Sequence, residues 1–150
     1  MYCYKYPHPA VTADCIVFNR EEKTIKILLI KRNNEPFKDC WAFPGGFVNI
    51  DESAEDAAIR ELREETGLEV SNIEQLNAYS NPDRDPRERV ITIAFIAESR
   101  IEEVKGSDDA KEAKWFDISN LPSLAFDHEQ ILKDAIERIK KTRYHEIFCR

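Results

Sequence analysis

One helical segment that follows a pair of glycines constrains this chain more than any other part of the sequence. Asp56 stands three residues after Ser53, a spacing that resembles a capping box at a helix N-terminus. Gly67 is a residue type that favours the first position after a helix. The sequence therefore predicts a helix over Ala54–Thr66, a few residues after the Pro-Gly-Gly break at 44–46.

The predicted helix carries three carboxylates on one face. Glu61, Glu64 and Glu65 stand three and four positions apart, so they share an arc of about 100°. Like charges at this spacing destabilise a helix, and partial burial increases the cost. Two interpretations stay open: a solvated acidic face, which is usual for charge runs, or a divalent cation site beside Gly45 and Gly46. A glycine pair favours the second because it lets a backbone carbonyl approach the same site.

Apolar and β-branched runs predict a sheet around this helix. Strands are expected over 11–18, 24–30, within 70–80, over 89–97 and over 112–117, and a last helix ends near Lys141. The first two strands are separated by a polar turn and form an opening hairpin. The run at 90–97 is nearly unbroken in its apolar character, which is typical of a central strand buried on both faces. Strands and helices around one sheet form a single domain, residues 1–150.

Composition narrows the classes of function. The chain has 150 residues, 22 Lys and Arg against 29 Asp and Glu, and a net charge of −7. No apolar run reaches the roughly 18–20 residues that span a bilayer, and the first residues resemble no targeting segment, so we expect no membrane partner. The acidic balance argues against nucleic-acid binding. The dispersed cysteines, Cys3, Cys15, Cys40 and Cys149, indicate reduced thiols and a cytoplasmic protein.

The helix and its flanks match a known motif at nine defined positions. These are Gly46, Glu52, Arg60, Glu61, Leu62, Glu64, Glu65, Gly67 and Leu68. With its spacing, G-x5-E-x7-R-E-U-x-E-E-x-G-U where U is aliphatic, the segment resembles the Nudix box, so the chain is similar to the Nudix hydrolase family. The resemblance implies the α/β class, a Nudix-type α/β/α sandwich with a mixed β-sheet. It also implies hydrolysis of a nucleoside diphosphate linked to another moiety.

The resemblance also implies roles for the box residues. Glu61, Glu64 and Glu65 would ligate Mg²⁺ or Mn²⁺ and serve catalysis, with the Gly45 carbonyl as a further ligand. Glu52 and Arg60 would form an internal ion pair, and Gly46 and Gly67 would shape the box. Arg60 could instead pair with Glu64 at i+4, which leaves Glu64 the least certain ligand. Metal held between carboxylates and pyrophosphate suits in-line attack of water at phosphorus.

The general base is harder to assign from the motif. In this family it is a box glutamate or an acidic residue on a distant loop. Asp108, Asp109 and Glu112 precede Trp115 in the region where that residue usually stands, and Asp109 is the first choice. The alternative is that these are ordinary surface acids.

Two further segments point to a substrate. The loop 81–88, with its Arg-Asp-Pro-Arg sequence, and residues 124–128 resemble Nudix proteins that handle ADP-ribose. The match is loose at Glu88, where that subgroup commonly has glycine. Arg84 and Arg87 would bind phosphate in bidentate fashion. The alternative is that they pair with Asp83, Asp85 and Glu88 inside the loop.

A second cationic pair and several aromatic residues are candidate substrate contacts. Lys31 and Arg32 stand at the end of the second strand, near the Pro-Gly-Gly break. Phe37, with Trp41, Phe126 and His128, would offer a base a stacking surface. The alternative for the cations is a solvated position, and for the aromatic rings a place in the core.

Three functions remain in view. The leading one is metal-dependent hydrolysis of ADP-ribose to AMP and ribose 5-phosphate. The second is a MutT-like pyrophosphohydrolase of nucleoside triphosphates of the 8-oxo-dGTP or CTP type, and the Arg-Asp-Pro-Arg loop disfavours it. The third is a non-catalytic ADP-ribose sensor, but residues 142–150 are too few for a DNA-binding domain. A nucleotide-type small molecule is the expected partner, and a homodimer is a further expectation because many relatives form one.

Overall fold

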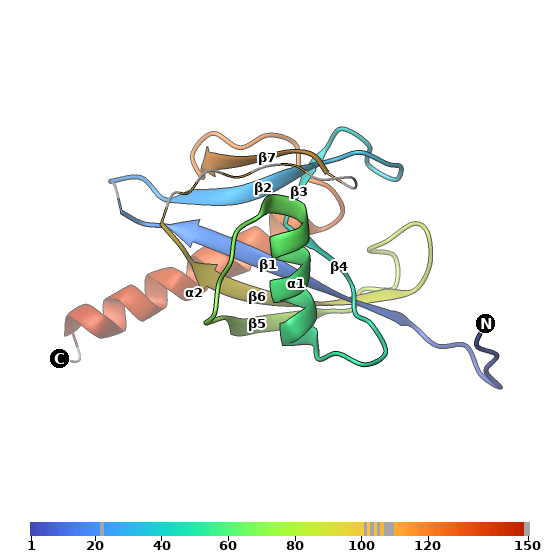
Figure 1. Cartoon of the computed structure of the whole chain (residues 1–150). Coiled ribbons are helices and arrows are strands. Elements are labelled where there is room, and N and C mark those ends of the chain that lie inside the picture. The colour runs from blue at the N-terminus through green and yellow to red at the C-terminus, as the bar shows by residue number, and fades with distance from the viewer. Residues whose placement is uncertain (22, 101, 103, 105, 107–109, 149–150) are drawn as a thin grey trace.

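A mixed β-sheet covered by one helix on each face is the frame of the molecule (Figure 1). This computed structural model describes residues 1–21, 23–100, 102, 104, 106 and 110–148. The strands are β1 Ala10–Asn19, β2 Lys26–Arg32, β3 Trp41–Ala42, β4 Gly45–Phe47, β5 Glu74–Tyr79, β6 Val90–Glu98 and β7 Ala110–Asp117. The helices are α1 Ala54–Thr66 and α2 His128–Phe148.

Strand β1 lies at the centre of the sheet. It pairs in parallel with β6 along nearly its whole length, from Ala10 opposite Val90 to Phe18 opposite Glu98. The other pairings are antiparallel: β1 with β2 and β4, β2 with β3 and β7, and β5 with β6. Because β2 and β4 both pair with β1, the glycine pair at the start of β4 lies beside the middle of the central strand.

Alternation along β1 divides the core into two layers. Its odd-numbered residues pack with α1, in a cluster that includes Ala13, Cys15, Val17, Ala58, Leu62 and Phe95. Its even-numbered residues pack with α2, in a cluster that includes Ile16, Phe18, Leu29, Ile131, Leu132 and Ala135. Successive side chains of a strand point to opposite faces, so a strand apolar at both parities requires a helix on each side. The predicted α/β/α sandwich with a mixed sheet is confirmed.

Helix α1 has the predicted bounds because its ends are determined locally. The Ser53 hydroxyl accepts a hydrogen bond from the Asp56 backbone N–H at 3.1 Å, and Gly67 ends the helix in the left-handed region with φ 78°. The predicted end of the last helix near Lys141 is wrong, because α2 continues to Phe148. No glycine or proline follows Lys141 to stop it.

Among the helices that the structure describes, none combines the length and apolar character needed to cross a bilayer.

Candidate active site

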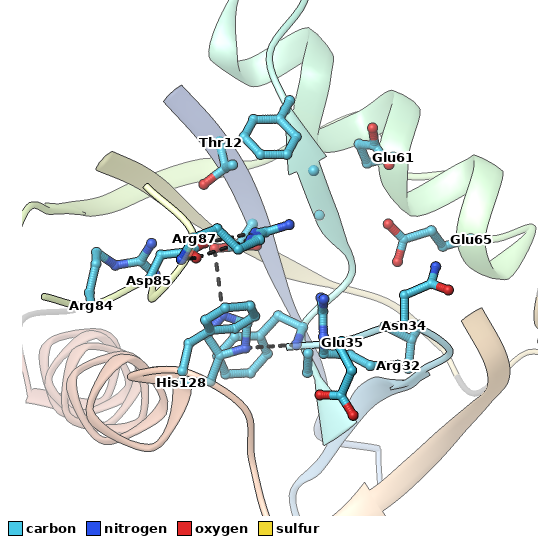
Figure 2. Close-up of a pocket in the computed structure, with 18 of the residues that line it drawn as sticks. Thr12, Arg32, Asn34, Glu35, Glu61, Glu65, Arg84, Asp85, Arg87 and His128 are labelled. Carbon is cyan, nitrogen blue, oxygen red and sulfur yellow. Dashed lines mark hydrogen bonds and ion pairs between the residues drawn. The ribbon is translucent and has the colours of Figure 1, made fainter. Parts of the chain in front are cut away.

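A cleft of about 430 Å³ opens between α1, the loop before β6 and the start of α2 (Figure 2). Its lining is mostly polar and charged. The charged and imidazole side chains in it are Asp14, Arg32, Glu35, Glu61, Glu65, Arg84, Asp85, Arg87 and His128. In Figure 2, Glu61 and Glu65 project from α1 on one side, and Arg84, Asp85 and Arg87 lie across the cleft. The cleft therefore has an acidic side and an arginine-bearing side.

The glycine pair allows the α1 carboxylates to lie against strand β4. A Cβ at Gly46 would come within 2.6 Å of the Glu61 carboxyl carbon, and a Cβ at Gly45 would overlap the Asp14 side chain. The Gly45 backbone N–H donates a hydrogen bond to Glu65. A side chain at Gly46 would push Glu61 away from β4, and one at Gly45 would collide with Asp14 and the backbone of β1.

Glu61 and Glu65 form a close pair at the base of the cleft. Glu65 is buried, and its pKa is raised by burial, by a hydrogen bond with Glu61 and by the charge of Glu61. Two adjoining carboxylates, one of them buried, need a proton or a cation between them. Within the described ranges no cluster of three or more His, Cys, Asp or Glu is arranged to hold a metal. A pair still fits Mg²⁺ or Mn²⁺, since Mg²⁺ commonly takes one or two carboxylates plus water and substrate oxygens.

Glu64 is placed differently from its two neighbours. Its side chain is 54% exposed and accepts a hydrogen bond from Arg60 Nη1 at 3.1 Å, and it does not line the cleft. The arc of about 100° that the three glutamates share is wide enough for one edge to face the sheet and the other to face solvent. The structure therefore brings Glu61 and Glu65 together and leaves Glu64 at the side, where the i+4 pairing with Arg60 is present.

Arg60 links helix α1 to the loop that precedes it, which carries Glu52. It donates two hydrogen bonds to Glu52, at 2.6 and 2.9 Å, and one to Glu61 at 2.9 Å. The bonds from Arg60 and from the Asn49 backbone lower the pKa of Glu52 to about 2. The ion pair expected between Glu52 and Arg60 is present, and through Arg60 it also restrains Glu61.

The arginines across the cleft are already paired with carboxylates. Arg87 donates two hydrogen bonds to Asp85, at 2.7 and 3.0 Å, as the loop-pairing alternative predicts. Arg84 instead donates two to Asp127, at 2.7 and 3.0 Å, and its side chain is 4% exposed. These two arginines are oriented by acids, one inside the loop and one directly before α2.

Arg32 differs from the other two arginines. Its Nε donates to the Pro36 carbonyl at 2.8 Å, and no ion pair to it is found among the described residues. Burial and the nearby positive charge of Arg87 lower its pKa. A half-buried cation beside another cation is suited to an anionic ligand.

The predicted aromatic surface is only partly at the cleft. Phe126 lines it, and Phe37 packs against Phe126 with ring centroids 4.8 Å apart but does not itself line the cleft. Trp41 packs edge-on against Phe116, in the α2-side core. Of the candidate bases, Asp108 and Asp109 lie outside the described residues, and Glu112 lies on β7 with Lys31 Nζ at 3.9 Å. The Asp109 assignment stays a prediction.

A cluster of buried polar side chains beside the cleft is not marked by any motif in the sequence. Asp14 accepts a hydrogen bond from the Thr92 hydroxyl at 2.6 Å, and His128 Nε2 lies 3.8 Å from the same carboxylate. His128 Nδ1 accepts the Phe43 backbone N–H at 3.2 Å, and burial lowers the pKa of the imidazole. The signal that could have found Asp14 is a lone acid inside an apolar strand, because such an acid must have a partner.

The fold and the cleft together define a class of protein. An α/β/α domain with two adjoining carboxylates on a helix, facing arginines across a cleft, suits the hydrolysis of a phosphate anhydride with a divalent cation. A family model described as the NUDIX domain matches residues 8–138. The chain belongs to the Nudix family of hydrolases.

Individual relatives agree with this membership. The chain is 57% identical over 129 residues, 86% of its length and 74% of the relative's, to an ADP-ribose pyrophosphatase of Methanocaldococcus jannaschii. The NUDIX domain of Shewanella oneidensis NrtR, solved with ADP ribose, superposes with a TM-score of 0.84 at 32% identity, covering 89% of this chain and 90% of that one.

A third relative was solved with both a nucleotide and a metal. It is a bifunctional NMN adenylyltransferase/ADP ribose pyrophosphatase from Francisella tularensis, complexed with AMP and a Mn ion. It superposes with a TM-score of 0.79 at 30% identity, and the match covers 90% of this chain and 43% of that one.

Proposed function

We propose that this chain hydrolyses ADP-ribose to AMP and ribose 5-phosphate. The observation that carries the proposal is the cleft that brings the Glu61 and Glu65 carboxylates together with Arg32, Arg84 and Arg87, of which Arg84 and Arg87 lie across the cleft from the glutamates. A pyrophosphate carries negative charge on both phosphoryl groups, so it needs cations on each side of it. The arginines provide them on one side, and a divalent cation held by the glutamates provides them on the other.

Glu61 and Glu65 are the proposed metal-holding side chains, with the Gly45 carbonyl as a further ligand. Glu64 remains a proposed third carboxylate ligand of the metal. To bind the metal it would give up the hydrogen bond that it accepts from Arg60. When bound, Mg²⁺ or Mn²⁺ would neutralise the carboxylate pair, polarise the phosphoryl oxygens and lower the pKa of the attacking water. The chain's own contribution is to hold these acids in place through Arg60 and the glycine pair.

The arginine side is the proposed binding surface for the substrate. Arg32, Arg84 and Arg87 face the phosphates, and Phe126, with Phe37 packed against its ring, lies beside them in the cleft. The names of the Methanocaldococcus and Francisella relatives, both pyrophosphatases of ADP-ribose, support this substrate over a nucleoside triphosphate. The homodimer remains a prediction of the family resemblance.

The proposed reaction consumes one water. The water oxygen bonds to one phosphorus while the bond from that phosphorus to the bridging oxygen breaks, and the bridging oxygen leaves on the second phosphate. A base accepts the proton that the attacking water loses, and Asp109 is the proposed base outside the box. Hydrolysis at the pyrophosphate yields AMP and ribose 5-phosphate in equal amounts.

The experiment that tests this function is a comparison of substrates with separate detection of each product. The protein is incubated with ADP-ribose, UDP-sugars, 8-oxo-dGTP and CTP, in Mg²⁺, in Mn²⁺ and in EDTA. We expect ADP-ribose to be cleaved with the highest kcat/KM, only with metal, to equal amounts of AMP and ribose 5-phosphate. If pyrophosphate is released preferentially from a triphosphate, that triphosphate and not ADP-ribose is the substrate. If ADP-ribose binds without turnover in either metal, the protein is a sensor.

A further inference from the structure

The segment that leads into α2 contacts all three cleft arginines through two consecutive residues. The ring of Phe126 has the guanidinium carbon of Arg32 at 4.9 Å from its centroid and that of Arg87 at 5.7 Å. Both distances fall within the range of cation–π attraction. Asp127, the next residue, receives the paired hydrogen bonds of Arg84.

This segment is itself held firmly against the sheet. The Ala125 N–H donates to the Trp41 carbonyl at 2.8 Å, and the His128 imidazole accepts the Phe43 N–H at 3.2 Å. Phe126 lies between these anchors with φ 52°, in the left-handed region that costs a residue with a side chain of its size free energy. The surrounding bonds keep the backbone there, so they fix the point from which the ring extends toward the arginines.

The contacts leave the arginines able to bind a ligand. A guanidinium has five N–H donors, and the bonds found in the described part of the chain use only Nε of Arg32 and only Nε and Nη2 of Arg87. Two nearby cations tend to separate, and attraction to the same ring opposes that tendency. Phe126 therefore favours the position of both guanidinium groups at the cleft, together with Phe47 for Arg87, while their remaining donors stay available.

We propose that Phe126 and Asp127 are positioning residues, which hold Arg32, Arg87 and Arg84 in the arrangement that binds the substrate phosphates. The proposal rests on the proposed function, since it concerns the phosphates of the same substrate. It assigns these two residues to substrate binding and leaves the hydrolytic step to the glutamate side. If the Phe126 ring only stacked on the base, its loss would weaken the binding of adenine. If it were only a core residue, its loss would lower stability and leave binding unchanged.

The experiment separates phosphate binding from base binding. Calorimetry in EDTA gives Kd for ADP-ribose and for adenosine without turnover, and steady-state assays with metal give KM and kcat. The variants are Phe126→Leu, Phe126→Tyr and Asp127→Asn. Two matched controls lie outside the cleft: Phe116→Leu, which loses a ring packed on Trp41, and Asp134→Asn, which loses a carboxylate that accepts the Tyr79 hydroxyl hydrogen.

We expect Phe126→Leu and Asp127→Asn to raise KM and the Kd of ADP-ribose by roughly tenfold, with kcat within about threefold of wild type. Adenosine affinity should stay unchanged, Phe126→Tyr should restore ADP-ribose binding, and the controls should bind as wild type does. If Asp127→Asn does not fold, Phe126→Leu alone decides the result.

Three outcomes would overturn the proposal. Unchanged KM and Kd in Phe126→Leu would show that the ring does not position the arginines. An equal loss for adenosine and ADP-ribose would assign the ring to base stacking, and a loss of kcat alone would place it in the hydrolytic step. Failure of wild type to cleave ADP-ribose in the presence of metal contradicts the proposed function itself, and is seen before any variant is compared.

Discussion

The Glu61 carboxyl group lies directly against Gly46, so closely that a Cβ on the glycine would come within 2.6 Å of the carboxyl carbon. Gly46→Ala should therefore displace Glu61 from the cleft and lower kcat/KM by roughly tenfold or more, with little change in stability. The matched control is Gly67→Ala, at the αL end of α1. It should lose about 1 kcal/mol of unfolding free energy and keep its activity. Activity of Gly46→Ala equal to wild type would mean that the position of Glu61 is unimportant.

The pair between Arg84 and Asp127 should matter for stability as well as binding. Because the Arg84 side chain is 4% exposed, Asp127→Asn leaves a buried charge without its partner and should cost about 2–4 kcal/mol of unfolding free energy. Urea denaturation measures the loss. The double variant Arg84→Met/Asp127→Leu removes both charges and should recover most of it. A single variant as stable as wild type would show that the pair is replaced by water.

His128 should give the protein a dependence of stability on pH. Burial lowers the pKa of its imidazole in the folded state, although Asp14 and Asp127 oppose the shift and Arg84 and Arg32 add to it. As pH falls, the unfolded chain therefore binds a proton at this imidazole before the folded chain does. The stability that the neutral, buried imidazole contributes is lost as pH falls below about 6.5.

Urea midpoints at pH 7.5, 6.5 and 5.5 measure that dependence. His128→Asn keeps an acceptor for the Phe43 N–H and removes the titration, so its slope below pH 6.5 should be smaller by up to about 1.4 kcal/mol per pH unit. His8→Asn, in the exposed N-terminal segment, is the control and should match wild type. Identical slopes in wild type and His128→Asn would refute a neutral, buried His128.

Two of the cysteines should differ sharply in reactivity. Cys15 is fully buried in β1, and burial, with a contribution from the charge of Asp14, raises the pKa of its thiol to about 12. Cys3 is exposed. Under native conditions a thiol reagent should modify Cys3 within minutes and leave Cys15 unmodified until the protein is unfolded in urea. Mass spectrometry of the digested protein locates the label, and early labelling of Cys15 would show that β1 opens readily.

The parts of the structure that were predicted correctly depend on local signals. Ser53 and Gly67 determine both ends of α1 within a few residues of sequence, so its bounds could be predicted. The apolar run of β6 required burial on both faces. The predicted last helix is too short, because no glycine or proline after Lys141 marks the position where α2 ends.

The residues of the candidate site were easier to predict than the partners that orient them. Spacing brought Glu61 and Glu65 to one face, but the same spacing could not show that Glu64 lies at the exposed edge of the arc. The partner of Arg84 is Asp127, which lies 43 residues away in sequence, directly before α2. No pattern within the loop 81–88 could indicate it. Asp14 stands alone as an acid in an apolar strand, and its partners Thr92 and His128 come from distant parts of the sequence, so no local pattern indicates them.

The measurement that tests the central claim most directly is Mn²⁺ binding, followed by electron paramagnetic resonance, together with ADP-ribose turnover by the same preparations. We predict that Glu61→Gln and Glu65→Gln remain folded, bind Mn²⁺ about 10–100-fold more weakly than wild type and lose at least two orders of magnitude in kcat/KM. Glu64→Gln should lose less of both. Wild-type Mn²⁺ affinity and turnover in both Glu61→Gln and Glu65→Gln would contradict the assignment of this carboxylate pair.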